Sequence, residues 1–306
     1  MKKLYLLGHP VGHSKSPVMH NAAYAQLGLP WEYEACDLPT GQQAEDFLAS
    51  RDYFALNITT PYKPQAYAAA DVKAASAQLA HGVNLVANKD GVLMGFNVDG
   101  QGAVRFLERE GVCFMGAKVA VCGTGPTALA ILHACVIAGA GEVLLLGRDK
   151  ARARRVLEDY VEDYRHLAST AIPMPSAEDN HLGFVEAYDH ASFKFGSYDG
   201  CTKAIAAADV IVDATVLGMK EGDPAPFDAD LLHAGQVVMD TVYGHGETAL
   251  VHAARAAGCR AFDGAGMLVS QAALTAITLG EVAGCPLEAG YGELFDIMSE
   301  AAGFDI

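Results

Sequence analysis

The sequence predicts an α/β protein built from two domains. Short β-rich runs alternate with alanine-rich helical stretches, which is typical of parallel α/β architecture. At mid-chain, a glycine-rich turn joins a fully apolar strand to a helix. A length of 306 residues corresponds to about two domains. Hydrophobic residues make up 51% of the chain and charged residues 19%, so the chain can bury large cores and is not disordered.

The first hundred residues alternate regularly between strands and helices. The expected strands span residues 3–8, 31–37 and 54–59, and the expected helices span 16–27, 42–50 and 64–80. Residues 84–88 and 92–96 are expected to form a hairpin, because the Asp90-Gly91 pair between them is typical of a tight turn. A helix over residues 100–110 follows.

The alternation starts again after Gly116. The expected elements are strand 118–122, helix 128–138, strands 142–146, 209–213, 236–240 and 259–262, and final helices 267–283 and 286–298. The final helices are expected to return to the first domain. We therefore expect one domain of residues 1–100 and 264–306 and a second of residues 101–263. Residues 166–200 have no clear period and are expected to form a loop with short elements.

The glycine-rich turn has the spacing of a dinucleotide-binding loop. Gly123, Gly125 and Ala128 follow a buried strand and open a helix. In this pattern the first glycine permits the turn, the second lets a pyrophosphate approach the backbone, and the small third residue lets helix and strand pack closely. Pro126 suits the first helical turn, where its missing N–H would be unpaired anyway. We predict a Rossmann-like domain with phosphates at this helix N-terminus; a merely tight βα turn is the alternative.

The end of the next strand indicates which cofactor binds. An acidic residue there would hydrogen-bond a ribose 2′-hydroxyl, whereas an arginine would accept a 2′-phosphate. The strand is followed by Arg148, whose planar guanidinium matches phosphate geometry, and Arg152 stands one helical turn later. We therefore expect NADP. NAD remains an alternative because Asp149 is an unfavourable neighbour for a phosphate, and a solvated helix start would also explain the arginines.

Polar clusters stand where three apolar strands of the first domain end. They are residues 13–17, 57–63 and 97–100. Taken singly they have structural explanations: Ser16 before Pro17 has the position of a helix N-cap, and Asp99 suits the same role. Lys63 alone would be a solvated surface charge. Together the clusters are hard to explain by packing, and they indicate a functional site.

These clusters resemble the motifs of the shikimate dehydrogenase family. GHPVGHSKSP is similar to its GxPxxHSxSP motif, NITTPYK to its NVTxPxK motif, and VNLVANKDGVLMGFNVDG to its VNT…GxNTDG stretch. Four further segments resemble later family motifs in the same order: GTGPTA, DATVLGM, DTVYGHGET and GAGMLVSQA. The resemblance spans nearly the whole chain and fails only over residues 155–200.

The resemblance implies a reaction and the residues that perform it. The family reversibly reduces 3-dehydroshikimate to shikimate by hydride transfer from NADPH, in chorismate and aromatic amino acid biosynthesis. Lys63 and Asp99 would be the catalytic pair, since an ammonium can stabilise the developing alkoxide and donate its proton. The implied substrate-binding residues are Ser14, Ser16, Thr59, Asn84, Tyr243 and Gln271. The implied cofactor-binding residues are Gly123, Gly125, Pro126, Thr127, Ala128, Arg148, Arg152 and Gly264.

The chain also departs from the family motifs. The departures include Leu85 and Val98 in place of threonine, Asp213 in place of asparagine, Gly244 near an expected proline, and Pro126 and Thr127 in the glycine loop. None removes a proposed catalytic group, but the lost threonines affect recognition of ring hydroxyls. An NAD-dependent quinate or shikimate dehydrogenase is therefore an alternative. A non-catalytic ligand sensor is another, against which the retention of Lys63 and Asp99 argues.

Composition excludes several other classes of protein. The formal net charge of −16 disfavours binding to nucleic acid, and no basic patch offsets it. Seven scattered cysteines without a CxxC pair indicate free thiols and a reducing compartment. We expect a cytoplasmic protein without a secretory core, a membrane-spanning run or a metal site, acting on a small molecule as a monomer or homodimer.

Overall fold

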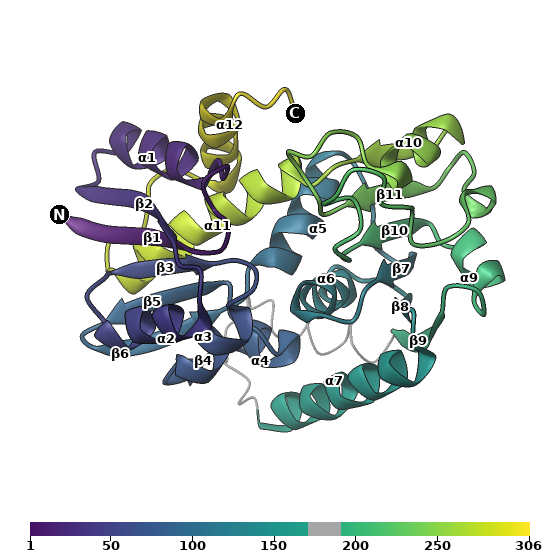
Figure 1. The fold of residues 1–306 in the computed structure, drawn as a ribbon, viewed down its shortest axis with the longest axis horizontal. Coiled ribbons are helices and arrows are strands. Elements are labelled where there is room, and N and C mark those ends of the chain that lie inside the picture. Colours follow the sequence, from purple (N-terminus) through teal and green to yellow (C-terminus); the bar gives the residue numbers. More distant parts are fainter. Residues whose placement is uncertain (171–190) are drawn as a thin grey trace, which may run out of the picture. The chain divides into compact units, whose positions relative to one another are not determined.

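The computed structural model describes residues 1–170 and 191–306, and side chains are described for residues 1–167 and 191–306. The chain divides into two compact units, which are both α/β (Figure 1). Unit 1 comprises Met1–Ala103 and Met267–Ile306, and unit 2 comprises Val104–Gly266. These junctions lie three residues after the expected ones at 100 and 264.

Unit 1 contains a six-stranded mixed sheet with the strand order β2-β1-β3-β5-β6-β4. The strands are β1 (Lys2–Gly8), β2 (Trp31–Asp37), β3 (Ala55–Ile58), β4 (Val72–Lys73), β5 (Leu85–Lys89) and β6 (Val92–Phe96). Only β5 runs antiparallel to the others. The carboxyl ends of β1, β3 and β6 therefore meet the start of β5 at one edge of the sheet.

Helices cover both faces of this sheet. On one face lie α1 (Ser16–Gln26), α11 (Ala265–Val282) and α12 (Tyr291–Ala302), and on the other lie α2 (Gly41–Ser50), α3 (Lys63–Ala69) and α4 (Ala75–Ala80) (Figure 1). Apolar side chains from β1, β3, β5 and β6 pack against α2, α3 and α4 in one buried cluster. Burial of this apolar surface is the main stabilising contribution to the unit.

The helix α11 is long and apolar enough to cross a membrane by length and composition, with a mean hydropathy of 1.3. We expected no run of this kind. In the structure 67% of the helix is buried inside the protein, and Ala272, Ala276 and Leu279 are fully buried. These observations identify α11 as a core helix of unit 1.

Three predictions about unit 1 were wrong in detail. The expected helix over 64–80 is broken into α3 and α4 by β4, because Val72 and Lys73 pair with Met94 and Gly95 of β6. The last helix begins at Tyr291 and not at 286, with Gly290 as its N-cap. Lys15, and not Ser16, is the N-cap of α1.

Within its described residues, unit 2 contains a six-stranded, fully parallel sheet with the order β12-β11-β10-β7-β8-β9. The strands are β7 (Lys118–Cys122), β8 (Glu142–Gly147), β9 (Ser192–Ser197), β10 (Val210–Asp213), β11 (Val237–Asp240) and β12 (Arg260–Phe262). Numbered from β7 as the first strand, this is the 3-2-1-4-5-6 order of the Rossmann fold. The predicted fold class is confirmed.

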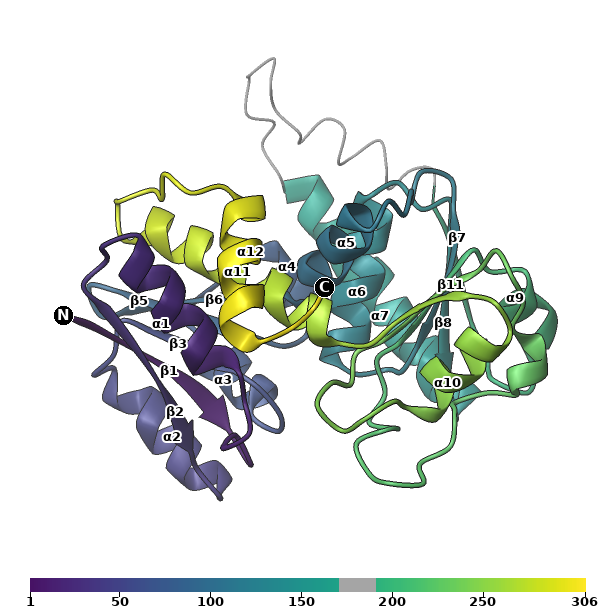
Figure 2. The same cartoon turned by 90° about the horizontal axis from the view of Figure 1, so that it is seen from above.

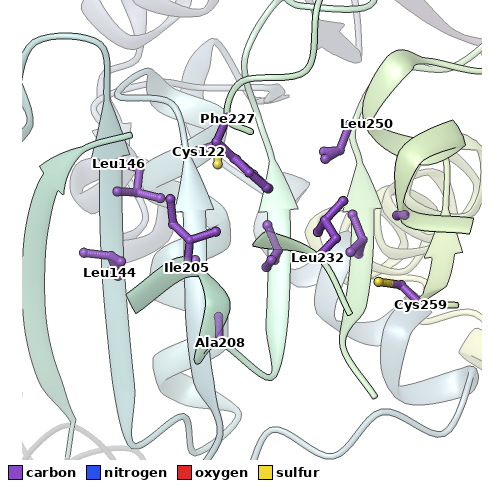
Figure 3. Close-up of a cluster of buried hydrophobic side chains, with 13 residues drawn as sticks. Cys122, Leu144, Leu146, Ile205, Ala208, Phe227, Leu232, Leu250 and Cys259 are labelled. Atoms are coloured by element: carbon purple, nitrogen blue, oxygen red, sulfur yellow. The ribbon is translucent and has the colours of Figure 1, made fainter. Parts of the chain in front are cut away.

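Helices also cover both faces of this second sheet. Figure 2 shows α6 (Pro126–Ile137) and α7 (Lys150–Thr170) on one face and α9 (Thr202–Ala206) and α10 (Ala249–Ala256) on the other. The helix α5 (Asp99–Arg109) joins the two units in sequence. On the α9 and α10 face, Cys122, Leu144, Leu146 and Ile205 belong to a buried apolar cluster (Figure 3).

The segment 166–200, expected to be a loop with short elements, contains more regular structure than we expected. The helix α7 extends to Thr170, and residues 192–197 form the edge strand β9, which pairs in parallel with β8. Residues 171–190 of this segment lie outside the described residues. The strand was missed because its sequence, SFKFGS, has mixed polarity, as befits an exposed sheet edge.

Candidate active site

The polar clusters of unit 1 gather at one edge of its sheet. Thr59 directly follows β3, and its N–H donates to Leu7 O of β1 at 2.9 Å. Asn84 directly precedes β5 and is tied to both neighbouring strand ends: its carbonyl accepts from Ile58 N at 2.7 Å, and its N–H donates to Phe96 O at 3.0 Å. The strand order therefore brings together segments that are distant in sequence.

Lys63, Asp99 and Asn84 form the centre of this edge. The Lys63 ammonium donates to Asp99 Oδ2. Asn84 Nδ2 donates to the other carboxylate oxygen, Oδ1, at 2.6 Å. The Lys63 side chain is 15% exposed and the Asp99 side chain 10%, so this ion pair is largely shielded from water. The structure thus joins three of the predicted site residues by direct hydrogen bonds.

A further residue, Asn97, supports this centre and was not among the predicted site residues. Its Oδ1 accepts from Asp99 N at 3.1 Å, and its Nδ2 donates to Gly82 O at 3.0 Å. In addition, Asn84 Oδ1 accepts from Val98 N at 2.9 Å. These bonds fix the backbone at the start of α5 and so orient the Asp99 carboxylate. Its place in the polar segment 97–100 was the available sequence signal.

Ser14 and Ser16 lie in the turn between β1 and α1. Ser14 Oγ lies 3.2 Å from Ser16 Oγ and also accepts from Ser16 N at 3.2 Å. Ser16 is buried and Ser14 is half-buried. Their hydroxyl groups therefore form a compact pair of hydrogen-bonding groups.

Gln271 lies on α11, where it packs against the start of α5. A Cβ atom at Gly102 would lie 2.8 Å from Gln271 Cβ and 2.9 Å from Gln271 N. Only glycine allows the two helices to approach this closely. Gln271 Nε2 donates to Leu268 O at 2.9 Å. Gly102 is three residues from Asp99, so this contact brings Gln271 near the same end of α5.

In unit 2 the glycine loop follows the central strand β7. Gly123 has a φ of +116°, and a Cβ there would lie 2.9 Å from Ala214 O of the neighbouring loop after β10. Gly125 is the N-cap of α6 and makes no side-chain cap, and Pro126 opens the helix. Thr127 and Ala128 continue its first turn. An uncapped helix N-terminus with a glycine cradle fits the phosphates of a dinucleotide.

Arg148 and Arg152 are both exposed at the end of β8 and the start of α7. Asp149 between them caps α7: its Oδ1 accepts from Ala151 N at 2.8 Å and Arg152 N at 3.3 Å. The helix amides thus hydrogen-bond to the carboxylate that we expected to be an unfavourable neighbour of a 2′-phosphate. The arginines at this strand end fit NADP.

The remaining predicted residues, Tyr243 and Gly264, belong to unit 2. Gly264 N donates to Val242 O at 3.0 Å, next to the half-buried Tyr243. Gly264 is therefore tied to the loop that follows β11. Tyr243 was predicted to bind substrate, but all other predicted substrate-binding residues belong to unit 1.

Two buried carboxyl groups, Asp213 and Asp240, end the adjacent strands β10 and β11 and pair in register. Each is 1% exposed. Burial, followed by the charge of Asp240, raises the pKa of Asp213 to about 7. Burial is also the main cause that raises the pKa of Asp240, with Asp263 adding to the rise. The prediction of site residues did not include this pair.

The parallel sheet with its glycine loop, together with the ammonium–carboxylate centre, defines a dinucleotide-dependent oxidoreductase. Comparisons with known proteins specify the family. A family model described as the shikimate dehydrogenase substrate binding domain matches residues 6–86. A shikimate dehydrogenase (NADP(+)) from Rubrobacter xylanophilus is 36% identical over 270 residues, which cover 87% of this chain and 86% of that protein. The chain belongs to the shikimate dehydrogenase family.

Solved structures agree with this membership. The shikimate 5-dehydrogenase of Thermus thermophilus in complex with NADP(H) and shikimate matches with a TM-score of 0.77 and 26% identity, over 98% of this chain and 100% of that chain. The quinate dehydrogenase of Corynebacterium glutamicum in complex with NAD matches with a TM-score of 0.76 and 26% identity, over 98% and 99% of the two chains. The resemblance inferred from the sequence motifs is confirmed.

Proposed function

We propose that this protein reversibly reduces 3-dehydroshikimate to shikimate with NADPH. The observation that carries the proposal is the shielded centre of Lys63, Asp99 and Asn84. It combines a proton donor with hydrogen-bonding groups suited to a ring bearing several hydroxyls. The names of the relatives and the arginines after β8 support NADP as the cofactor.

Bound NADPH supplies the hydride for this reduction. The Lys63 ammonium stabilises the negative charge that develops on the ketone oxygen and donates a proton to it. Asp99 holds that ammonium in position, while Asn84 fixes the second oxygen of the carboxylate. In the reverse direction the same amine accepts the hydroxyl proton.

The other predicted residues would bind and orient the substrate. The hydroxyl pair of Ser14 and Ser16 suits a carboxylate, because two hydroxyl donors can bind its two oxygens. Thr59 and Gln271 would bind ring hydroxyls from β3 and α11, and Tyr243 would lie beside the substrate. Phosphate groups of the cofactor would bind at the N-terminus of α6.

The test is an initial-rate assay at the absorbance of reduced nicotinamide, with shikimate or quinate and NADP or NAD in all four pairs. We expect the highest kcat/KM with shikimate and NADP. A preference for quinate with NAD would replace both the substrate and the cofactor of this proposal. Binding of shikimate without turnover in any pair would indicate a ligand sensor.

A further inference from the structure

The carboxyl pair Asp213 and Asp240 lies beside the glycine loop and has no role in the proposed chemistry. Asp213 pairs in register with Cys122 of β7 on one side and with Asp240 of β11 on the other. Residues in register on parallel strands share a face of the sheet, so all three point to the same side. That side is the one filled by the apolar cluster of Figure 3, which includes Ile211 and Val238, two residues before each aspartate.

The two carboxyl groups differ in whether both of their oxygens accept a hydrogen bond. Asp240 accepts at both oxygens, from Val242 N at 2.9 Å and from Thr248 Oγ1 at 2.7 Å. Asp213 accepts from Thr215 N at 2.9 Å through Oδ1, and the Thr215 side chain adds a second hydrogen bond, but no partner of the buried Oδ2 is found among the described residues. A buried carboxylate oxygen without a donor is costly, whereas a protonated carboxyl group carries no charge. The single proton of such a pair therefore belongs on Asp213.

The groups that face Asp213 do not offset a charge there. They are Asp240 from β11, Cys122 from β7 and the half-buried Tyr198 beyond β9, while Asp263 acts on Asp240 and Arg148 on Tyr198. Burial is the largest cause raising the pKa of both Cys122 and Tyr198, so both are neutral near neutral pH. Ionised Asp213 would thus place a second negative charge beside Asp240, and the described residues that face it supply no cation to balance that charge.

The loop after β10 connects this carboxyl group to the glycine loop. Asp213 Oδ1 accepts a hydrogen bond from Thr215 N. The carbonyl oxygen of the intervening Ala214 lies 2.9 Å from the position that a Cβ atom would occupy on Gly123. Gly218, further along the same loop, lies close to Thr248, the residue that donates to Asp240. A movement of this loop that admitted water to an ionised Asp213 would disturb the close approach of Ala214 O to Gly123.

We propose that Asp213 is a positioning residue for the dinucleotide: its neutral carboxyl group orders residues 214–218 against the glycine loop, and its ionisation weakens cofactor binding. This rests on the proposed function only in taking NADP as the ligand of unit 2. Relative to the family motif, the chain has an ionisable group here in place of a permanently neutral asparagine.

The experiment compares the wild-type protein with Asp213→Asn, in which a neutral amide of the same shape replaces the carboxyl group. The Kd for NADP is measured by calorimetry from about pH 6 to about pH 9. The ratio of the two Kd values at each pH cancels the titration of the cofactor's own 2′-phosphate. We expect the Kd for NADP of the wild-type protein to rise roughly fivefold or more relative to that of the variant as the pH rises.

Asp209→Asn is the matched control, because Asp209 is an exposed aspartate just before the opposite end of β10. Asn at this position can still accept from Lys118 N, as Asp209 does at 2.8 Å. We expect this variant to keep the wild-type pH profile. A Kd ratio for Asp213→Asn that stays constant with pH overturns the proposal. Loss of NADP binding at every pH in a folded Asp213→Asn variant also overturns it, since the carboxylate would then be the required form.

Two further measurements keep the test decisive. If Asp213→Asn does not fold, carbon NMR of the aspartate carboxyl groups in the wild-type protein replaces it. One group must then titrate near neutral pH, and completion of all aspartate titrations below about pH 5.5 overturns the proposal. Shikimate oxidation measured in parallel separates the two hypotheses: absence of turnover counts against the proposed function, whereas normal turnover with a constant Kd ratio counts against Asp213 alone.

Discussion

Both sheets carry buried carboxyl groups at their carboxyl edges, but the two units surround them in opposite ways. In unit 1, Asp99 accepts from the Lys63 ammonium and from the Asn84 amide, so each oxygen has a donor. In unit 2, Asp213 stands beside a second carboxyl group above an apolar cluster, and one of its oxygens lacks a hydrogen-bond partner in the part of the chain that the structure describes. Similar burial therefore accompanies an ion pair in one unit and a carboxyl group with a raised pKa in the other.

The comparison shows that partners, rather than burial alone, determine what a carboxyl group does. An ammonium and an amide keep a charge available next to a reacting substrate. A neighbouring carboxylate instead pushes the proton onto the group with fewer donors. The first arrangement suits proton transfer, and the second suits a structural role that depends on pH.

The largest expected effect comes from removing the cation of unit 1. Lys63→Ala should lower kcat by about 10²- to 10⁴-fold, the range that general acid–base catalysis contributes. Because all predicted cofactor-binding residues belong to unit 2, the Kd for NADP should change little. Steady-state kinetics and NADP titration measure the two effects. Lys89→Ala, an exposed lysine at the end of β5, is the control. Near-normal turnover of Lys63→Ala would remove this residue from the mechanism.

Removing the negative charge of the same ion pair should have a smaller effect. Asp99→Asn should lower kcat/KM for shikimate by about 10- to 100-fold, as expected for the loss of hydrogen bonds to a charged group. Both kcat and KM should change, because the amide no longer accepts at both positions. Asp90→Asn, an exposed residue in the hairpin turn, is the control. If both constants are unchanged, Asp99 is not the partner that positions Lys63.

In unit 2 the same type of substitution should stabilise the protein. The pKa of Asp213 is raised to about 7 by burial, so the folded state binds more protons than the unfolded state between about pH 4 and pH 7. Wild-type stability therefore falls as the pH rises through this window, and the penalty is fully present above it. Asp213→Asn should raise the free energy of unfolding by a few kcal/mol at about pH 8 and by little at about pH 4.

Denaturant unfolding at the two pH values measures this difference. Asp209→Asn should show no comparable pH dependence, because Asp209 is exposed. If Asp213→Asn changes the free energy of unfolding by the same amount at both pH values, the assignment of a neutral Asp213 is contradicted. Replacing a buried aspartate by asparagine should therefore lower kcat/KM in unit 1, at Asp99, and raise the free energy of unfolding in unit 2, at Asp213.

The sequence was sufficient to predict most elements because their signals are local. A strand is indicated directly by an apolar run such as 118–122, and a turn by the spacing of Gly123 and Gly125. The polar clusters indicated the position of the candidate active site because each cluster stands at the end of a strand. By contrast, the two-residue strand β4 depends on pairing with Met94 and Gly95, which no local pattern in an alanine-rich stretch reveals.

The carboxyl pair shows the same limit at the level of the site. The sequence showed Asp213 as a departure from a motif, but not that it stands beside Asp240. That proximity follows from the register of β10 and β11, two strands separated by more than twenty residues. Likewise, Asp149 was interpreted as unfavourable for a phosphate, whereas in the structure its carboxylate caps α7. Hydrogen-bond partners had to be known before the role of either residue could be inferred.

The smallest expected effect concerns the exposed charges of unit 2. Arg148→Ala should raise the KM for NADP on the order of tenfold and change the KM for NAD little, because only NADP carries the 2′-phosphate. Arg154→Ala, an exposed arginine paired with Glu158 on α7, is the matched control. Equal effects on both cofactors would refute the assignment. Added salt should reduce the contribution of the exposed Arg148 to NADP binding but should leave the pH-dependent effect of Asp213 unchanged, because salt screens buried charges much less.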